Sequence, residues 1–181
     1  AAAGSVLRVN PFNQPDVQLT KALTGGFMSK KKGSAEQNGE VLKEYEVGHP
    51  GSLESALDNW LNRAEPAAYI AIQAYLAPYG KVYNGIEIIR KKLLEKTLLA
   101  TTLGFGPRFL HSAGQLHKGG PETGLFLQLV DEPEPDISIP GEDYTFGSLI
   151  RAQSIGDFLA LKQLNRHVLR INLGKDVLSG L

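Results

Sequence analysis

Four polar side chains between residues 108 and 118 have the types and the spacing to bind and protonate a ligand. They are separated by three, four and three residues, so on a helix they would form one polar stripe. Histidine is the side chain whose ordinary pKa lies near neutrality, which lets it both donate and accept a proton at pH 7. The pattern favours His111 as an acid or base, although a hydrogen-bonded histidine on a solvated helix face fits it too. The stripe consists of Arg108, His111, Gln115 and Lys118.

A second pair of polar side chains follows a β-branched run near the start of the chain. Gln14 lies at an expected strand-to-helix turn, and Lys21 lies seven residues further on, about two helical turns away. Because ligands of α/β sheets gather where strands end and helices begin, both are candidate binding residues. The same positions also fit a helix cap at Gln14 and a solvated Lys21.

The composition excludes several other kinds of site. The sequence has 19 Lys and Arg against 19 Asp and Glu, a balance that gives no electrostatic argument for a nucleic-acid partner. The absence of cysteine excludes disulfides, thiolate nucleophiles and cysteine-based metal centres. His111 and His117 are six residues apart and do not share a helix face, and no glycine-rich nucleotide motif is present. We therefore expect no metal ion and no organic cofactor.

Strand-like and helix-like segments alternate along the chain. Apolar or β-branched runs predict strands, whereas amphipathic spacing bounded by caps and breakers predicts helices. The expected strands span residues 6–9, 41–47, 67–76, 99–103, 125–130 and 168–173. The expected helices span residues 15–23, 52–61, 85–98, 108–118 and 145–164. This alternation predicts an α/β fold, a three-layer sandwich with a largely parallel sheet.

The length is sufficient for one domain with a substantial core, which we expect to span residues 6–181. Residues 29–39 contain three consecutive lysines and no periodicity, which predicts a flexible surface loop. The small residues 1–5 are typical of a cloning remnant rather than of a signal peptide. No apolar run approaches the roughly 20 residues that a membrane-spanning helix requires, so we expect a cytoplasmic protein without a membrane partner.

Two long motifs resemble one enzyme family. The segment GPRFLHSAGQLHKGGPETGLFLQL (106–129), with IPGEDYTFGSLIRAQSIGDFLAL (139–161), resembles the C-terminal part of the glucose-6-phosphate isomerase half of bacterial bifunctional transaldolase/glucose-6-phosphate isomerases. The segment LRVNPFNQPDVQLTK (7–21) resembles a second signature of the same family. The likeness covers most of residues 6–173, and two independent motifs make it specific.

The resemblance implies a sugar-isomerase (SIS)-like domain that works beside a second such domain, with the active site between them. It implies that His111 protonates the ring oxygen of the sugar and opens the pyranose. Lys21 would assist ring opening and contact substrate hydroxyls. Gln14 would hold polar groups of the sugar phosphate, and Gln115 would be a supporting neighbour.

The implied reaction also needs groups that these motifs do not supply. Aldose–ketose isomerisation requires a carboxylate to move a proton between C1 and C2, and a cation to stabilise the developing oxyanion. The family's glycine-rich segment with this glutamate has no counterpart here, and Glu36 in AEQNGE resembles it only superficially. The Ser/Thr-rich phosphate loop has no counterpart either. We therefore expect both in an upstream half of a longer polypeptide.

The leading hypothesis is a glucose-6-phosphate isomerase domain that interconverts glucose 6-phosphate and fructose 6-phosphate as part of a transaldolase fusion. This would place it in glycolysis, gluconeogenesis and the pentose phosphate pathway. Its expected partners are the sugar phosphate and the upstream domain, and a homo-oligomer is left open. The alternative is a non-catalytic sugar-phosphate-binding or interaction module. A third hypothesis, a helix-rich scaffold, predicts that Lys21 and His111 lie on unrelated surfaces.

Overall fold

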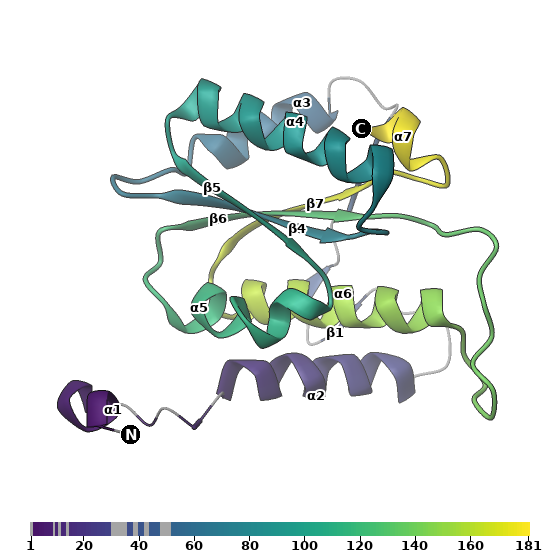
Figure 1. The fold of residues 1–181 in the computed structure, drawn as a ribbon, viewed down its shortest axis with the longest axis horizontal. Helices are drawn as coiled ribbons and strands as arrows, with labels where there is room; N and C mark the ends of the chain where they lie inside the picture. Colours follow the sequence, from purple (N-terminus) through teal and green to yellow (C-terminus); the bar gives the residue numbers. More distant parts are fainter. Residues whose placement is uncertain are drawn as a thin grey trace.

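Five parallel strands form the central sheet, in the order β3-β7-β6-β4-β5 (Figure 1). The strands span Tyr45–Glu46 (β3), Tyr69–Tyr75 (β4), Ala100–Phe105 (β5), Gly124–Val130 (β6) and His167–Asn172 (β7). The structure is a computed structural model that describes residues 2–8, 10, 12–13, 15–29, 36–37, 40–41, 44–47 and 52–181. It confirms the predicted α/β class and shows that the five-stranded sheet is parallel throughout.

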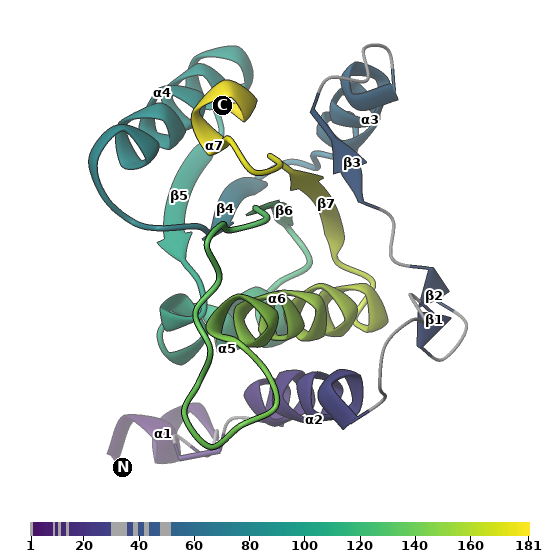
Figure 2. The same cartoon turned by 90° about the vertical axis from the view of Figure 1, so that its right-hand side faces the viewer.

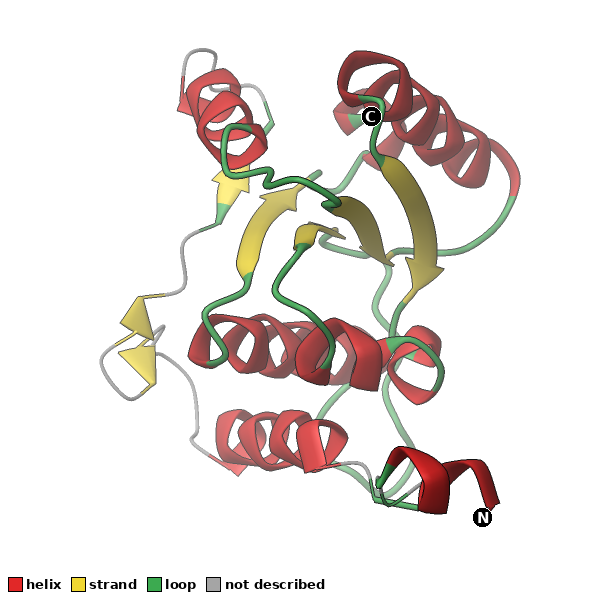
Figure 3. Cartoon of the chain, turned by 90° about the vertical axis from the view of Figure 1, so that its left-hand side faces the viewer, coloured by secondary structure: helices red, strands yellow, loops and turns green. Residues whose placement is uncertain are grey.

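Helices cover both faces of this sheet and complete a three-layer sandwich (Figures 1 and 2). One face carries α3 (Ser52–Leu61), α4 (Gly80–Thr97) and α7 (Val177–Gly180). The other face carries the 3₁₀ turn η1 (Arg108–His111), α5 (Gly114–Gly119) and α6 (Phe146–Gln163). Helix α2 (Pro15–Ser29) lies along the outer side of α6 as a further layer (Figure 3). No helix in the described part of the chain is both long and apolar enough to cross a membrane.

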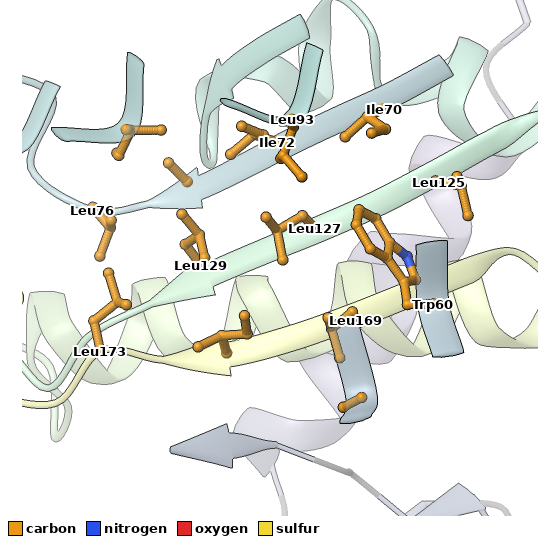
Figure 4. Close-up of a cluster of buried hydrophobic side chains, with 14 residues drawn as sticks. Trp60, Ile70, Ile72, Leu76, Leu93, Leu125, Leu127, Leu129, Leu169 and Leu173 are labelled. Carbon is orange, nitrogen blue, oxygen red and sulfur yellow. The ribbon is translucent and has the colours of Figure 1, made fainter. Parts of the chain in front are cut away.

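The main hydrophobic core lies between the sheet and the α3/α4/α7 face (Figure 4). Strands β4 and β6 are central in the sheet and almost wholly buried, which explains their nearly continuous apolar sequences. Trp60 of α3 packs in this core, and its indole N–H donates to the His167 carbonyl at 3.1 Å. The larger core side chains are Trp60, Ile70, Ile72, Leu76, Ile86, Leu93, Leu125, Leu127, Leu129, Leu169, Ile171 and Leu173.

The N-terminal part of the chain differs from the predicted pattern. The prediction of a strand at residues 6–9 is wrong, because Ala2–Leu7 forms helix α1 and Arg8 forms a turn after it. Val9 lies outside the described residues. Alanine has the highest helix propensity, and none of the described strands pairs with this segment.

Residues 29–47, expected to form a loop followed by a strand, also differ from the prediction. The strand expected at residues 41–47 is reduced to β3, and Glu40–Val41 (β2) instead pairs antiparallel with Glu36–Gln37 (β1). The expected loop at residues 29–39 overlaps the end of α2 and contains β1. Its residues 30–35 and 38–39 lie outside the described part.

The helix expected over residues 108–118 is divided in two. Residues 108–111 form η1, the backbone leaves helical geometry at Ser112 (φ −121°, ψ −74°), and a separate helix α5 begins at Gly114. The Ser112 hydroxyl donates to the Phe109 carbonyl at 3.1 Å, a local bond of the kind that competes with helix formation. The four polar residues therefore do not form one stripe, and their side chains lie in different environments.

A close contact between α2 and α6 fixes the outer helix. A Cβ atom at Gly156 of α6 would lie 3.0 Å from the Thr20 carbonyl oxygen and 3.0 Å from the Thr24 amide nitrogen of α2. Glycine therefore lets the two helix backbones approach each other directly. Val17 and Thr20, on the inner side of α2, are buried in this contact.

We expect Gly156→Ala to lower the free energy of unfolding by about 1–3 kcal/mol, because the new methyl group would push α2 away from α6. Gly25→Ala, in α2 itself, is the matched control. A Cβ atom at Gly25 meets nothing within 4 Å, so this change should be neutral or stabilising by up to about 1 kcal/mol through helix propensity. Urea denaturation of both variants measures the difference. Equal effects of the two changes would contradict the close-packing interpretation.

Candidate functional site

A cavity of about 410 Å³ opens beside the carboxyl end of β5, between η1 and the outer helix α2. Strand β5 ends at Phe105, and the chain then passes through Gly106 and Pro107 into η1. Helix α2 supplies the opposite wall, and Gln153 of α6 lies between them. The lining residues are Val17, Thr20, Lys21, Thr24, Gly25, Pro107, Arg108, Leu110, His111 and Gln153.

Lys21 and His111 both line this cavity although they are ninety positions apart in the sequence. Lys21 lies on α2 and His111 is the last residue of η1, and both side chains are exposed. Their meeting depends on the packing of α2 along α6 and against α5, which brings residue 21 next to η1. The scaffold hypothesis predicted unrelated surfaces for these two residues, and the structure does not place them so.

The cavity is electrostatically positive. Its ten lining residues include the cations of Lys21 and Arg108 and the imidazole of His111, but no carboxylate. Within the described part of the chain, neither Lys21 nor Arg108 has a carboxylate within ion-pair distance. Their charges are therefore available to an anionic ligand, and the described residues of the cavity walls include no general base of the carboxylate type.

Gln115 is not among the described residues that line the cavity. The Gln115 amide donates to Asp16 Oδ2 at 2.5 Å and so ties α5 to the first turn of α2. Gln115 thus makes a contact between helices, and its expected role as a supporting neighbour of the sugar stays a prediction. Gln14 lies outside the described residues.

Lys118, expected on the exposed polar stripe, is instead fully buried. Its Nζ lies 2.5 Å from Asp157 Oδ1 of α6, and both side chains have 0% of their surface exposed. Burial raises the pKa of Asp157, and the Lys118 ammonium opposes this effect. The phenol of Tyr75 faces the same carboxylate, and its own pKa is raised well above the usual value by burial and by Asp157. The pair joins α5 to α6 beneath the sheet.

A row of polar side chains crosses the sheet beside this ion pair. Gln73 of β4 pairs in register with Gln128 of β6, and Gln128 pairs with Arg170 of β7. Arg170 donates to Gln128, to Ser154 Oγ at 3.1 Å and to Glu44 Oε2 at 2.6 Å. Gln73, Gln128 and Arg170 therefore lie at the same level on one face of the sheet. The sequence contains this signal as one glutamine in each of the apolar runs YIAIQAY and GLFLQLV and an arginine within HVLRIN, but their alignment requires the register.

His117 is the buried histidine of this region. Its Nδ1 lies 3.2 Å from the Gln73 amide nitrogen, and its ring packs between Phe109 and Phe126. Burial, assisted by the neighbouring Lys118 charge, lowers its pKa to about 4. His117 is therefore neutral at pH 7 and serves the packing of α5, whereas His111 is the exposed histidine of the cavity.

Comparisons with known proteins support the α/β fold but identify no reaction or ligand. No family model matches the sequence, and no curated protein matches it. The solved structure of a hypothetical protein from Thermus thermophilus is similar with a TM-score of 0.53 and 18% sequence identity. The match covers 68% of this chain and 34% of that chain, so the chain spans about one third of the length of that protein. This likeness shows a shared α/β fold alone.

We expect Lys118→Met to lower the free energy of unfolding by about 3–5 kcal/mol, because it leaves the Asp157 carboxylate buried without its partner. The double variant Lys118→Met with Asp157→Leu should be more stable than the single variant, since no unpaired charge remains. Urea denaturation measures both. A double variant that is less stable than Lys118→Met would contradict the role of the ion pair.

The pH dependence of stability should reflect two opposed groups. Between pH 6.5 and about 4, His117 is neutral in the folded chain but protonates when unfolded, so its contribution falls by up to about 3 kcal/mol as the pH falls. Burial raises the pKa of Asp131 from 3.8 to about 6, so the folded chain binds the extra proton there and stability rises as the pH falls.

The two slopes oppose each other, so single variants should separate them. Asp131→Asn should make stability fall more steeply on acidification than in the wild type, and His117→Gln should remove the fall. Urea denaturation at several pH values checks this expectation. Parallel pH profiles for the wild type and both variants would show that neither group controls the dependence.

Proposed function

We propose that this chain is the C-terminal sugar-isomerase domain of a glucose-6-phosphate isomerase, carried in a transaldolase fusion, that interconverts glucose 6-phosphate and fructose 6-phosphate. The observation that carries the proposal is that Lys21 and His111 line one cavity. These two residues come from the two separate motifs that resemble the family. Spatial convergence of both motifs at one sheet edge supports a shared role.

His111 serves as the acid that opens the sugar ring. A histidine gives a proton to the ring oxygen as the bond from C1 to that oxygen breaks, and the C1 hydroxyl gives its proton to a water molecule as the aldehyde forms. Lys21, on the facing wall, stabilises negative charge that develops on substrate oxygens during this step. The isomerisation that follows moves a proton between C1 and C2.

None of the described residues that line the cavity is a carboxylate, which fits a divided active site. The proton transfer between C1 and C2 requires a base, and the ten lining residues supply none of the carboxylate type. In the proposed enzyme the base and the phosphate loop come from an upstream half, which closes over the cavity. The positive lining of the cavity suits the charge of a sugar phosphate.

The test uses the complete polypeptide with its upstream region. We expect His111→Ala to lower kcat by about 100-fold or more, the usual contribution of a general acid, while affinity for fructose 6-phosphate changes little. Lys21→Met should lower kcat and raise KM together, since its charge acts on both bound substrate and transition state. A coupled assay for both reaction directions gives the two constants.

Matched controls come from residues of the same types outside the cavity. Lys92→Met on the exposed side of α4 and His167→Ala on β7 should leave both constants within about twofold of the wild type. Unchanged turnover in His111→Ala would remove this residue from the mechanism. Fructose 6-phosphate binding without turnover in the complete wild-type polypeptide would favour the non-catalytic binding module.

A further inference from the structure

The strand order creates a second place where a ligand is expected. From β4 the chain continues through α4 to β5 on one side, whereas β6, on the other side of β4, continues through α6 to β7. Helices α4 and α6 lie on opposite faces of the sheet (Figure 1). The direction of winding therefore reverses between β4 and β6. In open α/β sheets, ligands bind outside the carboxyl ends of the strands at such a point.

A cavity of about 360 Å³ lies at this position. Its walls come from the segments that follow β4 and β6, from the first half of α6, and from the turn after β5. The buried Tyr75, at the end of β4, contributes the floor. The other lining residues are Leu76, Ala77, Pro78, Tyr79, Gly106, Arg108, Val130, Asp131, Pro133, Gly147, Ile150, Arg151 and Ser154. This cavity is separate from the Lys21–His111 cavity and shares only Arg108 with it.

Three charged side chains define the chemistry of this second cavity. Arg108 enters it from η1 and Arg151 from α6, and Asp131 follows β6. Arg108 has no ion pair among the described residues. Arg151 has one long contact, 3.4 Å to Glu44, and 41% of its side chain is exposed. Both guanidinium groups therefore retain donors for a ligand, and guanidinium favours phosphate and carboxylate oxygens.

We propose that the cavity between the ends of β4 and β6 binds a small ligand with a phosphate or carboxylate group, held by Arg108 and Arg151, whose apolar portion lies against Leu76, Pro78 and Ile150. This site uses neither Lys21 nor His111, but it shares Arg108 with the cavity of the isomerase proposal. The neighbouring Tyr79 and Val130 extend the apolar wall.

Asp131 makes this binding sensitive to pH. Burial raises the pKa of Asp131 to about 6, so its carboxyl is largely neutral below that pH and negative above it. A negative Asp131 repels an anion in the same cavity. The other charged groups near Asp131 are Arg108 and Arg151 in the cavity, and Glu132, Glu134, Asp136 and Lys175 in the adjoining surface hollow.

Two of these neighbouring carboxylates already have partners. Glu134 pairs with Lys175 at 2.7 Å, and Asp136 accepts from the Gly147 amide at 2.8 Å and from the Thr145 hydroxyl at 2.5 Å. Hydrogen bonds keep the pKa of Asp136 below its usual value, so it stays charged throughout the range in which Asp131 titrates. Asp131 is therefore the carboxyl whose change of charge the ligand would detect.

The test is an NMR titration of the chain with sulfate, which keeps both negative charges across the range used. We expect sulfate to shift the amide signals of residues 76, 77, 79, 80, 131 and 132. Arg151→Met and Arg108→Met should each weaken sulfate binding at these signals by about tenfold or more, the loss typical of one charge-assisted contact. Lys21→Met and Lys92→Met should leave it unchanged.

Two outcomes of the sulfate titration would overturn the proposal. If Lys21→Met weakens the binding as much as Arg151→Met does, sulfate occupies the Lys21–His111 cavity and the proposal fails. Shifts that survive both arginine changes also overturn it. Denaturation curves show whether each variant retains its fold, and Arg151→Lys provides a milder change in case Arg151→Met does not.

A pH series separates the role of Asp131. In the wild type, sulfate affinity should fall as the pH rises through about 6. Asp131→Asn should bind more tightly than the wild type at about pH 7.5 and should show a flatter profile. A profile for Asp131→Asn identical to that of the wild type would remove Asp131 from the site.

Discussion

The buried ion pair between Lys118 and Asp157 is the interaction on which the candidate site depends. Removing two charges from water costs several kcal/mol for each ion, and only close contact with good geometry returns that cost. Here Nζ and Oδ1 lie 2.5 Å apart with both side chains fully buried, and Tyr75 faces the carboxylate. The pair fixes α5 against α6. Since η1 leads directly into α5, the pair also limits where His111 can lie.

The position of Lys21 is determined by a different kind of contact. Helix α2 lies outside the layer of α5 and α6. It packs on α6, most closely at Gly156, and the hydrogen bond from Gln115 to Asp16 joins it to α5. Helix α6 therefore supports both cavity residues, Lys21 through its contact with α2 and His111 through the ion pair with α5. Gln115 contributes to the site by joining α5 to α2, although it does not line the cavity.

The sequence predicts the sheet well and its buried chemistry poorly. Apolar runs such as LFLQLV can form only buried strands in a layered fold, so the predicted bounds of β4, β6 and β7 are close to the real ones. The short 3₁₀ turn at Arg108–His111 could not be predicted, because it depends on the burial of Phe109 and Leu110 and on the local bond of Ser112. Lys118 carries no local sign of burial, since its partner lies 39 positions away. The valine and leucine at residues 6 and 7 predict a strand, whereas they form the end of helix α1.

The segment Gly106–Arg108 forms the partition between the two cavities. Gly106 lines one, Pro107 lines the other, and Arg108 belongs to both. A Cβ atom at Gly106 would lie 2.5 Å from the Tyr75 ring. The backbone of this segment therefore packs directly against the ring, with no side chain between them. When the Arg108 guanidinium binds a ligand in one cavity, it is no longer free to bind a ligand in the other. By thermodynamic linkage, occupants of the two compartments that compete for Arg108 must then alter each other's affinity by one common factor.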